Sequence, residues 1–351
     1  MAKQTLAVKY RPNTFDDVME QESVKVILQQ QLQSNEVKNA YLFCGGAGTG
    51  KTTCARIFAN EINGGKGNPV EMDAASNSGV EDVRNIIQQA QTRSLDSEYK
   101  VFIIDECHSI SNTGWQAFLK LIEEPPAKSI FIFCTTDPQK IPKTILSRVQ
   151  RYDFQRISQY GIVNRLHDIL VSEQKEDYYN SGKASGITYK GEALEYIAKI
   201  ADGGMRDAIT LMDKCLSYAD ELTLENVIKA LGTVDYETMI RLTDCLLTMN
   251  GEEVVKIIEG VHAAGKDVKQ FIKLYMQFLL DVNKFLIGCG WDYINIPQLP
   301  EYEKWLESIV DPEAIGYIKN LLSTIINLNT DIKFSTAPKY DVEAVLLIEC
   351  M

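Results

Sequence analysis

The chain has 351 residues, of which 45% are hydrophobic and 24% are charged, and its formal net charge is −12. This length allows two or three domains with hydrophobic cores, and the composition is ordinary for a globular protein. Positive and negative residues balance up to residue 157, and the acidic excess lies beyond it. The single chain is therefore not expected to coat DNA through clustered cations, so any DNA contact must be local or assembled from several subunits.

Cysteine usage and hydropathy exclude two further classes. The eight cysteines form no C-x-x-C pair, which argues against a zinc site or a disulfide scaffold and indicates a reducing, cytoplasmic environment. The N-terminal stretch has no apolar signal core. The most apolar later stretch is broken by Asp281 and Lys284, so we expect no membrane segment.

Short apolar runs separated by helix-length segments predict a parallel α/β sheet in the first half. The runs are residues 41–44, 69–72, 101–105, 129–135 and 151–154, and a helix is expected from about Thr113 to the Pro-Pro pair after Glu124. Beyond residue 157 amphipathic helical patterns follow, with a polar Gly/Ser-rich loop over 175–187. We expect three domains: a nucleotide-type α/β domain (1–157), a small helical domain (158–232) and a larger helical domain (233–351).

The stretch GGAGTGKTT follows a predicted strand and satisfies G-x-x-x-x-G-K-S/T. Glycines let consecutive backbone N–H groups curl around phosphates at a helix N-terminus, Lys51 reaches the terminal phosphates, and Thr52 ligates Mg²⁺. A plain glycine-rich turn is the alternative. We predict nucleotide binding by Gly45, Gly46, Ala47, Gly48, Thr49, Gly50, Lys51, Thr52 and Thr53.

The stretch VFIIDECH supplies the second half of such a site. Asp105 ends an apolar strand, where it can hold the Mg²⁺ shell, and Glu106 can polarise the attacking water. A solvated strand end is the alternative, and DECH also resembles the D-E-x-H box of helicases. We expect His108 to be a structural or coupling residue. Thr136 ends the next strand and would stand beside Asp105, near the terminal phosphate.

Two arginines lie at positions where packing alone does not explain the presence of a cationic side chain. Arg148 precedes the last predicted strand, and Arg206 lies in the first turn of a helix after two glycines, although cations are disfavoured at helix N-termini. A nearby triphosphate would give both a role. A surface salt bridge is the alternative for each.

In order and spacing, the motifs resemble the AAA+ ATPases, and within them the clamp-loader branch of the bacterial DNA polymerase III gamma/tau family. The resemblance weakens beyond about residue 235, and it is carried by YRPNTFDDVMEQESV, NAYLFCGGAGTGKTTCARIFA, DAASNSGVEDVR, LIEEPP, TTDPQKIPKTILSR and GGMRDAITLMDK. It implies an AAA+ P-loop ATPase domain with a five-stranded parallel sheet, a helical lid and a helical collar that forms oligomers. The implied function is an ATPase motor subunit that uses ATP and Mg²⁺ to open a sliding clamp and load it onto primer-template DNA.

The resemblance also implies roles for single residues. Thr136 and Arg206 would be the two sensors of the γ-phosphate, and Arg148 would be an arginine finger that completes the ATP site of the neighbouring subunit. Delta- and delta-prime-like subunits and further copies of the chain would be partners. The adenine would pack on Tyr10, Arg11, Pro12 and Val18, and the catalytic set would be Lys51, Glu106, Thr136, Arg148 and Arg206.

Contacts to DNA and clamp are less specific. A helix N-terminus with Asn77, Ser78, Gly79 and Arg84 can take DNA phosphates without reading sequence, and a capped helix with a solvent arginine is the alternative. Trp115 and Phe118 are expected to be core residues, with clamp contact as the competing interpretation.

The chain departs from the family pattern in several places. Residues 60–72 contain no cysteine where the family carries a four-cysteine module, so we predict no zinc. Val149 replaces a cysteine beside the finger, the loop over 173–186 looks longer, and the chain ends about where the collar ends, so no tau-type tail is expected. Two other functions compete: a helicase or branch-migration motor, and a nucleotide-binding scaffold that does not hydrolyse ATP.

Overall fold

The computed structural model describes residues 4–77, 79–94, 96–181, 186–231 and 236–351. The chain forms two compact units, residues 1–223 and 224–351. The boundary after Thr223 differs from the expected boundary after residue 232, which remains a prediction. The division of the first unit at residue 157 remains a prediction.

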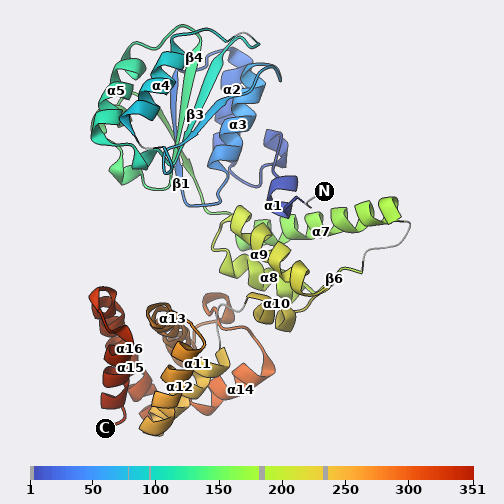
Figure 1. Ribbon diagram of the computed structural model, residues 1–351. Coiled ribbons are helices and arrows are strands. Elements are labelled where there is room, and N and C mark those ends of the chain that lie inside the picture. Colours follow the sequence, from blue (N-terminus) through green and yellow to red (C-terminus); the bar gives the residue numbers. More distant parts are fainter. Residues whose placement is uncertain (1–3, 78, 95, 182–185, 232–235) are drawn as a thin grey trace. The chain divides into compact units, whose positions relative to one another are not determined.

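The first unit is built on a five-stranded parallel sheet of order β2-β3-β4-β1-β5 (Figure 1). Every predicted strand is confirmed. The three inner strands are nearly continuous hydrophobic runs, as expected for strands buried on both faces, whereas the two edge strands have exposed positions. The connection that leaves β1 runs to one side of the sheet, toward β2, and the connection that leaves its neighbour β4 runs to the other side, toward β5. In open α/β sheets, ligands bind at the carboxyl ends of the strands where the connections run in opposite directions. The strands are β1 (Ala40–Gly45), β2 (Val70–Asp73), β3 (Lys100–Asp105), β4 (Ser129–Thr135) and β5 (Gln150–Phe154).

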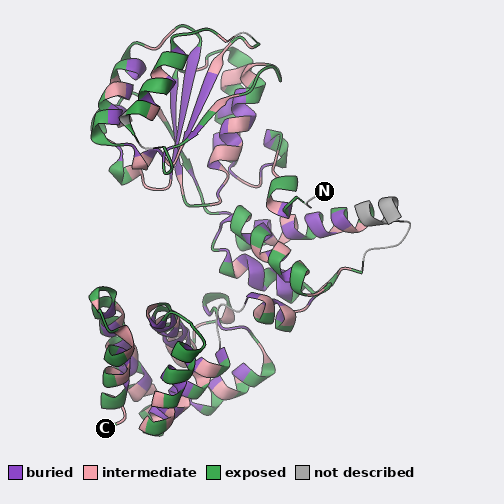
Figure 2. Ribbon diagram, in the orientation of Figure 1, coloured by how far each residue is buried: buried purple, intermediate pink, exposed green. Residues whose placement is uncertain are grey.

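Helices cover both faces of this sheet (Figure 1). On one face α2 (Glu22–Ser34) and α3 (Lys51–Ile62) pack over Tyr41 and Phe43. On the other face α4 (Val80–Ala90) and α5 (Asn112–Glu123) pack over Leu42 and its neighbours. Successive strand residues point to opposite faces, so β1 contributes to both cores, and Figure 2 shows the buried residues running along the strands.

Shorter elements and a helical region complete the first unit. Its remaining helices include α1 (Leu6–Lys9), η1 (Phe15–Asp17), η2 (Cys107–Ser109), η3 (Pro138–Lys140), α6 (Lys143–Leu146), α7 (Gln159–Ser181), α8 (Gly191–Ile200) and α9 (Met205–Tyr218). A two-stranded pair, β6 (Thr188–Tyr189) and β7 (Glu221–Leu222), accompanies them. These strands are too short to leave a periodic pattern in the sequence.

The predicted loop over 175–187 is wrong in its first part. Helix α7 continues to Ser181, and residues 182–185 lie outside the described ranges. Lys and Glu are good helix formers, and a polar composition alone does not end a helix.

The second unit is helical, as predicted. Its core is centred on buried residues such as Ile258, Tyr275 and Leu321. No helix within the described ranges has both the length and the apolar character needed to cross a bilayer. The elements are α10 (Leu224–Leu231), α11 (Tyr236–Leu247), α12 (Gly251–Ala263), α13 (Val268–Leu286), η4 (Trp291–Tyr293), α14 (Pro300–Ser308), α15 (Pro312–Asp331), η5 (Ile332–Phe334) and α16 (Pro338–Ile348).

Candidate active site

The P-loop (residues 45–53) connects the end of β1 to the start of α3, and its glycines are required by geometry. Gly45 and Gly48 have φ of +152° and +68°, a region that side-chain-bearing residues rarely adopt. A Cβ on Gly45 would lie 2.5 Å from the carbonyl oxygen of Phe154, and one on Gly48 would lie 2.9 Å from Cα of Gly204. The loop therefore fits only with glycine at these two places.

The backbone of this loop presents donors without acceptors. None of the N–H groups of residues 48–53 has a hydrogen-bond acceptor among the described residues. The N-cap of α3, Gly50, offers no side chain, and the first turn of the helix carries no acidic residue. Free N–H groups at a helix N-terminus form a ready anion site, so the loop fits a phosphate group.

Lys51 adds a buried cation to this site. Its side chain is only 6% exposed, and Nζ donates to the carbonyl oxygens of Gly45 and Gly46 at 2.9 and 2.7 Å. Within the described chain, no carboxylate lies within ion-pair distance of this ammonium group. Burial lowers the pKa of Lys51, and the nearby Asp105 and Glu106 oppose that shift. An anionic ligand would supply the partner that the ammonium group lacks.

Oxygen ligands stand beside the lysine. Thr52, in the first turn of α3, donates from Oγ1 to Oδ2 of Asp105 at 2.7 Å. Asp105 ends β3, so strand and helix bring together a hydroxyl and a carboxylate. Mg²⁺ prefers such oxygen ligands and is usually held by one or two of them together with phosphate and water. No group of three or more His, Cys, Asp and Glu side chains suited to a metal is found in the described ranges.

Glu106 lies next to this pair with its backbone in the left-handed region (φ +45°). Its Oε2 accepts a hydrogen bond from Oγ1 of Thr136 at 3.0 Å. Because β3 and β4 are neighbours, the ends of these strands meet, and the structure brings Thr136 to the Glu106 carboxylate.

A cavity of about 280 Å³ opens beside the P-loop. Residues 47–53, Asp105, Glu106 and Arg206 line it, as do Tyr10, Arg11, Pro12 and Val18. Gly45, Gly46 and Thr136 do not line this cavity. The cavity lining also includes Asp17, Arg165 and an apolar wall made of Ile157, Met205 and Ile209, which were not predicted from the sequence. Met205 and Ile209 stand close to Arg206 in the sequence, and Ile157 stands at the end of the predicted first domain. Their positions beside predicted site elements could have indicated them.

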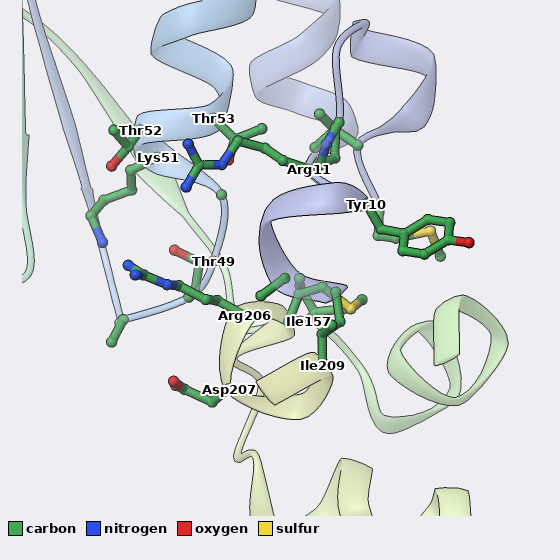
Figure 3. A pocket seen from close by; sticks show the side chains of 18 of the residues that line it. Tyr10, Arg11, Thr49, Lys51, Thr52, Thr53, Ile157, Arg206, Asp207 and Ile209 are labelled. Carbon is green, nitrogen blue, oxygen red and sulfur yellow. The ribbon is translucent and has the colours of Figure 1, made fainter. Parts of the chain in front are cut away.

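Figure 3 shows how the candidate ligand-binding side chains lie. Arg206 extends from α9 toward the P-loop, whereas the ring of Tyr10 is turned away from that loop. The Tyr10 hydroxyl donates to Oε1 of Glu173 at 2.7 Å. Tyr10 therefore borders the cavity while its polar end is held by α7.

The P-loop and α9 are joined directly. The backbone N–H of Met205 donates to the carbonyl oxygen of Gly48 at 3.0 Å. Arg206 is the next residue, so its position is tied to the loop that would hold a phosphate.

Arg148 lies elsewhere on the surface of the first unit. Its guanidinium pairs through Nε with Oε1 of Glu123 at 2.8 Å and donates to the carbonyl oxygen of Thr144 at 2.8 Å. The side chain is 39% exposed. Arg148 is not one of the described residues that line the cavity in its own chain.

The candidate DNA residues lie around the start of α4. Asn77 donates from Nδ2 to the carbonyl oxygen of Asp73 at 3.2 Å, and the N–H of Gly79 donates to Oδ2 of Asp82 at 3.3 Å. Arg84 is exposed. Ser78 lies outside the described residues.

The suggested clamp contacts do not fit the structure. Trp115 is 3% exposed and Phe118 is fully buried, and both rings pack near Phe133 of β4, with ring centroids 5.4 and 5.3 Å away. Helical spacing placed them on one face but could not show that this face meets the sheet. Their competing interpretation as core residues is the one that agrees with the structure.

The chain is similar to known proteins both in sequence and in fold. Residues 70–158 match the family model "DNA polymerase III, delta subunit", and residues 183–221 match "DNA polymerase III clamp loader subunit, ATPase lid domain". A mutant of Thermotoga maritima RuvB superposes with a TM-score of 0.50 at 19% identity, covering 73% of this chain and 86% of the other. That likeness shows the AAA+ fold alone.

Several curated relatives cover most of this chain. The DNA polymerase III subunit tau of Bacillus subtilis is 36% identical over 100% of this chain and 64% of that protein. The Escherichia coli subunit tau is 34% identical over 76% of this chain and 43% of that protein. The subunit gamma of Buchnera aphidicola is 27% identical over 99% of this chain and 98% of that protein. The chain thus spans less than two thirds of the two tau subunits.

Proposed function

Because the chain belongs to the clamp-loader branch of the AAA+ ATPases, in the family of the DNA polymerase III gamma/tau subunits, we propose that it is an ATPase motor subunit of a clamp loader. In this role it would couple ATP binding and hydrolysis to opening a sliding clamp and loading it onto primer-template DNA. The observation that carries the proposal is the buried Lys51 beneath the P-loop: within the described part of the chain, its ammonium group has no carboxylate partner and the N–H groups of 48–53 have no acceptor.

The nucleotide would be ATP with Mg²⁺. Lys51 and the N–H groups of 48–53 would hold the phosphates, with Arg206 reaching in from α9. Thr52 and Asp105 would hold the Mg²⁺, which when bound neutralises charge on the phosphate oxygens. Glu106 would orient the attacking water, with Thr136 on its carboxylate. The base would lie along Tyr10, Arg11, Pro12 and Val18, and the prediction of no zinc stands on the cysteine-free segment 60–72.

Arg148 would complete the ATP site of a neighbouring subunit. Its exposure, and its place outside the cavity of its own chain, support a role in trans. A cation supplied by a neighbour would make hydrolysis depend on correct assembly.

The proposed partners follow from this activity. They are a sliding clamp, delta- and delta-prime-like subunits, further copies of this chain, and primer-template DNA. Phosphates of the DNA would meet the start of α4, where Asn77, Gly79 and the exposed Arg84 lie.

The test is steady-state ATP hydrolysis by the chain assembled with its partner subunits. We expect clamp plus primed DNA to raise turnover above the basal rate, and Lys51→Ala to abolish turnover in the same assembly. Lack of stimulation with all components present would contradict the proposal. Unwinding of a forked duplex, measured in parallel, would point instead to a helicase.

A further inference from the structure

One histidine contacts the carboxylate that the proposed function assigns to water activation. Nδ1 of His108 lies 3.2 Å from Oε2 of Glu106. The same Oε2 already accepts the hydrogen bond of Thr136 at 3.0 Å. Within the described chain, Oε1 of Glu106 has no hydrogen-bond partner. Oε2 thus has a hydrogen bond from Thr136 and an ion-pair contact with His108, whereas Oε1 has neither.

The backbone places His108 over this carboxylate. The left-handed conformation of Glu106 (φ +45°, ψ +43°) turns the chain sharply at the end of β3, and η2 follows immediately. His108 therefore comes back toward the residue two positions before it. Non-glycine residues in this conformation are uncommon and collect at functional sites.

The imidazole is also fixed from the β4 side. Its Nδ1 lies 3.1 Å from Oγ1 of Thr135, which is fully buried. That Oγ1 accepts a hydrogen bond from the N–H of Asp137 at 3.0 Å. The ring is thus held between the ends of β3 and β4, and its side chain is only 19% exposed.

The partners indicate where the proton of the ring sits. An ionised carboxylate only accepts hydrogen bonds, so Nδ1 attracts Oε2 only if it carries a hydrogen. With a proton on Nδ1, the N–H would be shared between Oγ1 of Thr135, its hydrogen-bond partner at 3.1 Å, and Oε2 of Glu106, an ion-pair contact at 3.2 Å.

From this arrangement we propose that His108 is a positioning residue for Glu106. Together with Thr136 it holds Oε2, so that Oε1 is the oxygen left to orient the attacking water. The inference rests on the proposed ATPase function. It predicts that His108 governs the rate of hydrolysis and not the affinity for ATP, because it lies behind the carboxylate and does not line the cavity.

The experiment compares five variants in the assembled complex with clamp and primed DNA. His108→Leu removes the donor, and we expect kcat to fall about 10- to 100-fold with KM for ATP, nucleotide affinity and melting temperature unchanged. His108→Asn keeps an N–H near the place of Nδ1 and should recover most of the rate. His167→Ala, an exposed histidine on α7, is the matched control. In a Glu106→Gln background, His108→Leu should change the single-turnover rate by less than about twofold, since residues that act through one group are not additive.

The outcomes separate this inference from the proposed function. An assembled wild-type complex without ATPase activity would overturn both. An active wild type with unchanged kcat in His108→Leu would overturn the positioning role alone. A loss that persists in the Glu106→Gln background, or that comes with weaker ATP binding, a lower melting temperature and no recovery in His108→Asn, would show a structural role and would equally overturn it.

Discussion

Replacing Arg148 with alanine should separate folding from turnover. Among the described residues of its own chain the guanidinium makes one ion pair, with Glu123, and the two side chains are 39% and 43% exposed. Exposed pairs of this kind contribute about 0–1 kcal/mol. We therefore expect the free energy of unfolding of Arg148→Ala to change by less than about 1 kcal/mol and ATP binding to remain.

The effect on hydrolysis should be much larger. Arginine fingers contribute about 10³–10⁵ in rate in related phosphoryl-transfer enzymes. At 1.36 kcal/mol per factor of ten, this corresponds to about 4–7 kcal/mol of transition-state stabilisation. A variant that folds and binds ATP normally but loses this much turnover would agree with the proposed action of Arg148 on a nucleotide held by another subunit.

Mixing two defective variants provides the assay. Arg148→Ala keeps its own pocket but supplies no finger, whereas Lys51→Ala loses the pocket but keeps the finger. Complexes assembled from both should regain part of the turnover that neither shows alone. Arg151→Ala is the matched control, because Arg151 is also exposed and paired, with Asp153 at 2.7 Å, and should hydrolyse ATP normally.

Two results would refute this reasoning. Unchanged turnover in Arg148→Ala would mean that Arg148 is not the finger. An inactive variant that the Lys51→Ala partner never restores, although mixed complexes form, would mean that Arg148 acts within its own chain.

Three further changes test other features of the site. Gly48→Ala should lower the free energy of unfolding by about 1–3 kcal/mol, since the new Cβ would meet the backbone of Gly204. Gly260→Ala is the control: a Cβ at this position of α12 would meet no atom within 4 Å, so the free energy of unfolding should rise by up to about 1 kcal/mol. Urea denaturation measures both changes. Thr52→Val should raise the Mg²⁺ concentration for half-maximal ATPase roughly tenfold, with Thr52→Ser restoring it, and an unchanged Mg²⁺ titration would exclude this hydroxyl as a ligand. Burial raises the pKa of Cys44 to about 11, so the thiol keeps its proton at pH 8 and loses it only as pH rises toward that value. Mass spectrometry after brief iodoacetamide treatment should therefore find label first on the two half-buried free cysteines, Cys289 and Cys350. Early label on Cys44 would contradict its burial.

The sheet and the P-loop could be predicted from local sequence, because their requirements are local. Residues 129–135 read as a continuous hydrophobic run, and the strand is buried at every position. The glycines at 45 and 48 are demanded by backbone conformation and close approach. Such features need no knowledge of distant parts of the chain.

The contacts between segments were harder to predict. The position of Thr136 beside the end of β3 was expected, but its hydrogen bond to Glu106 was not, because that contact depends on the left-handed backbone of Glu106. The apolar wall at Ile209 depends on where α9 meets the P-loop. Trp115 illustrates the same gap, since its helical spacing is equally compatible with a face toward the sheet and a face toward a partner.

The hydrogen bond from the N–H of Met205 to the carbonyl oxygen of Gly48 has an evolutionary consequence. Both atoms belong to the main chain, so most amino-acid substitutions at these positions would leave the donor and the acceptor of this hydrogen bond in place. Only proline at position 205 would delete the donor, and the first residue of a helix is a place where proline is well accommodated. Met205→Pro would therefore remove the main-chain link between α9 and the P-loop, and it would also change one side chain of the apolar cavity wall.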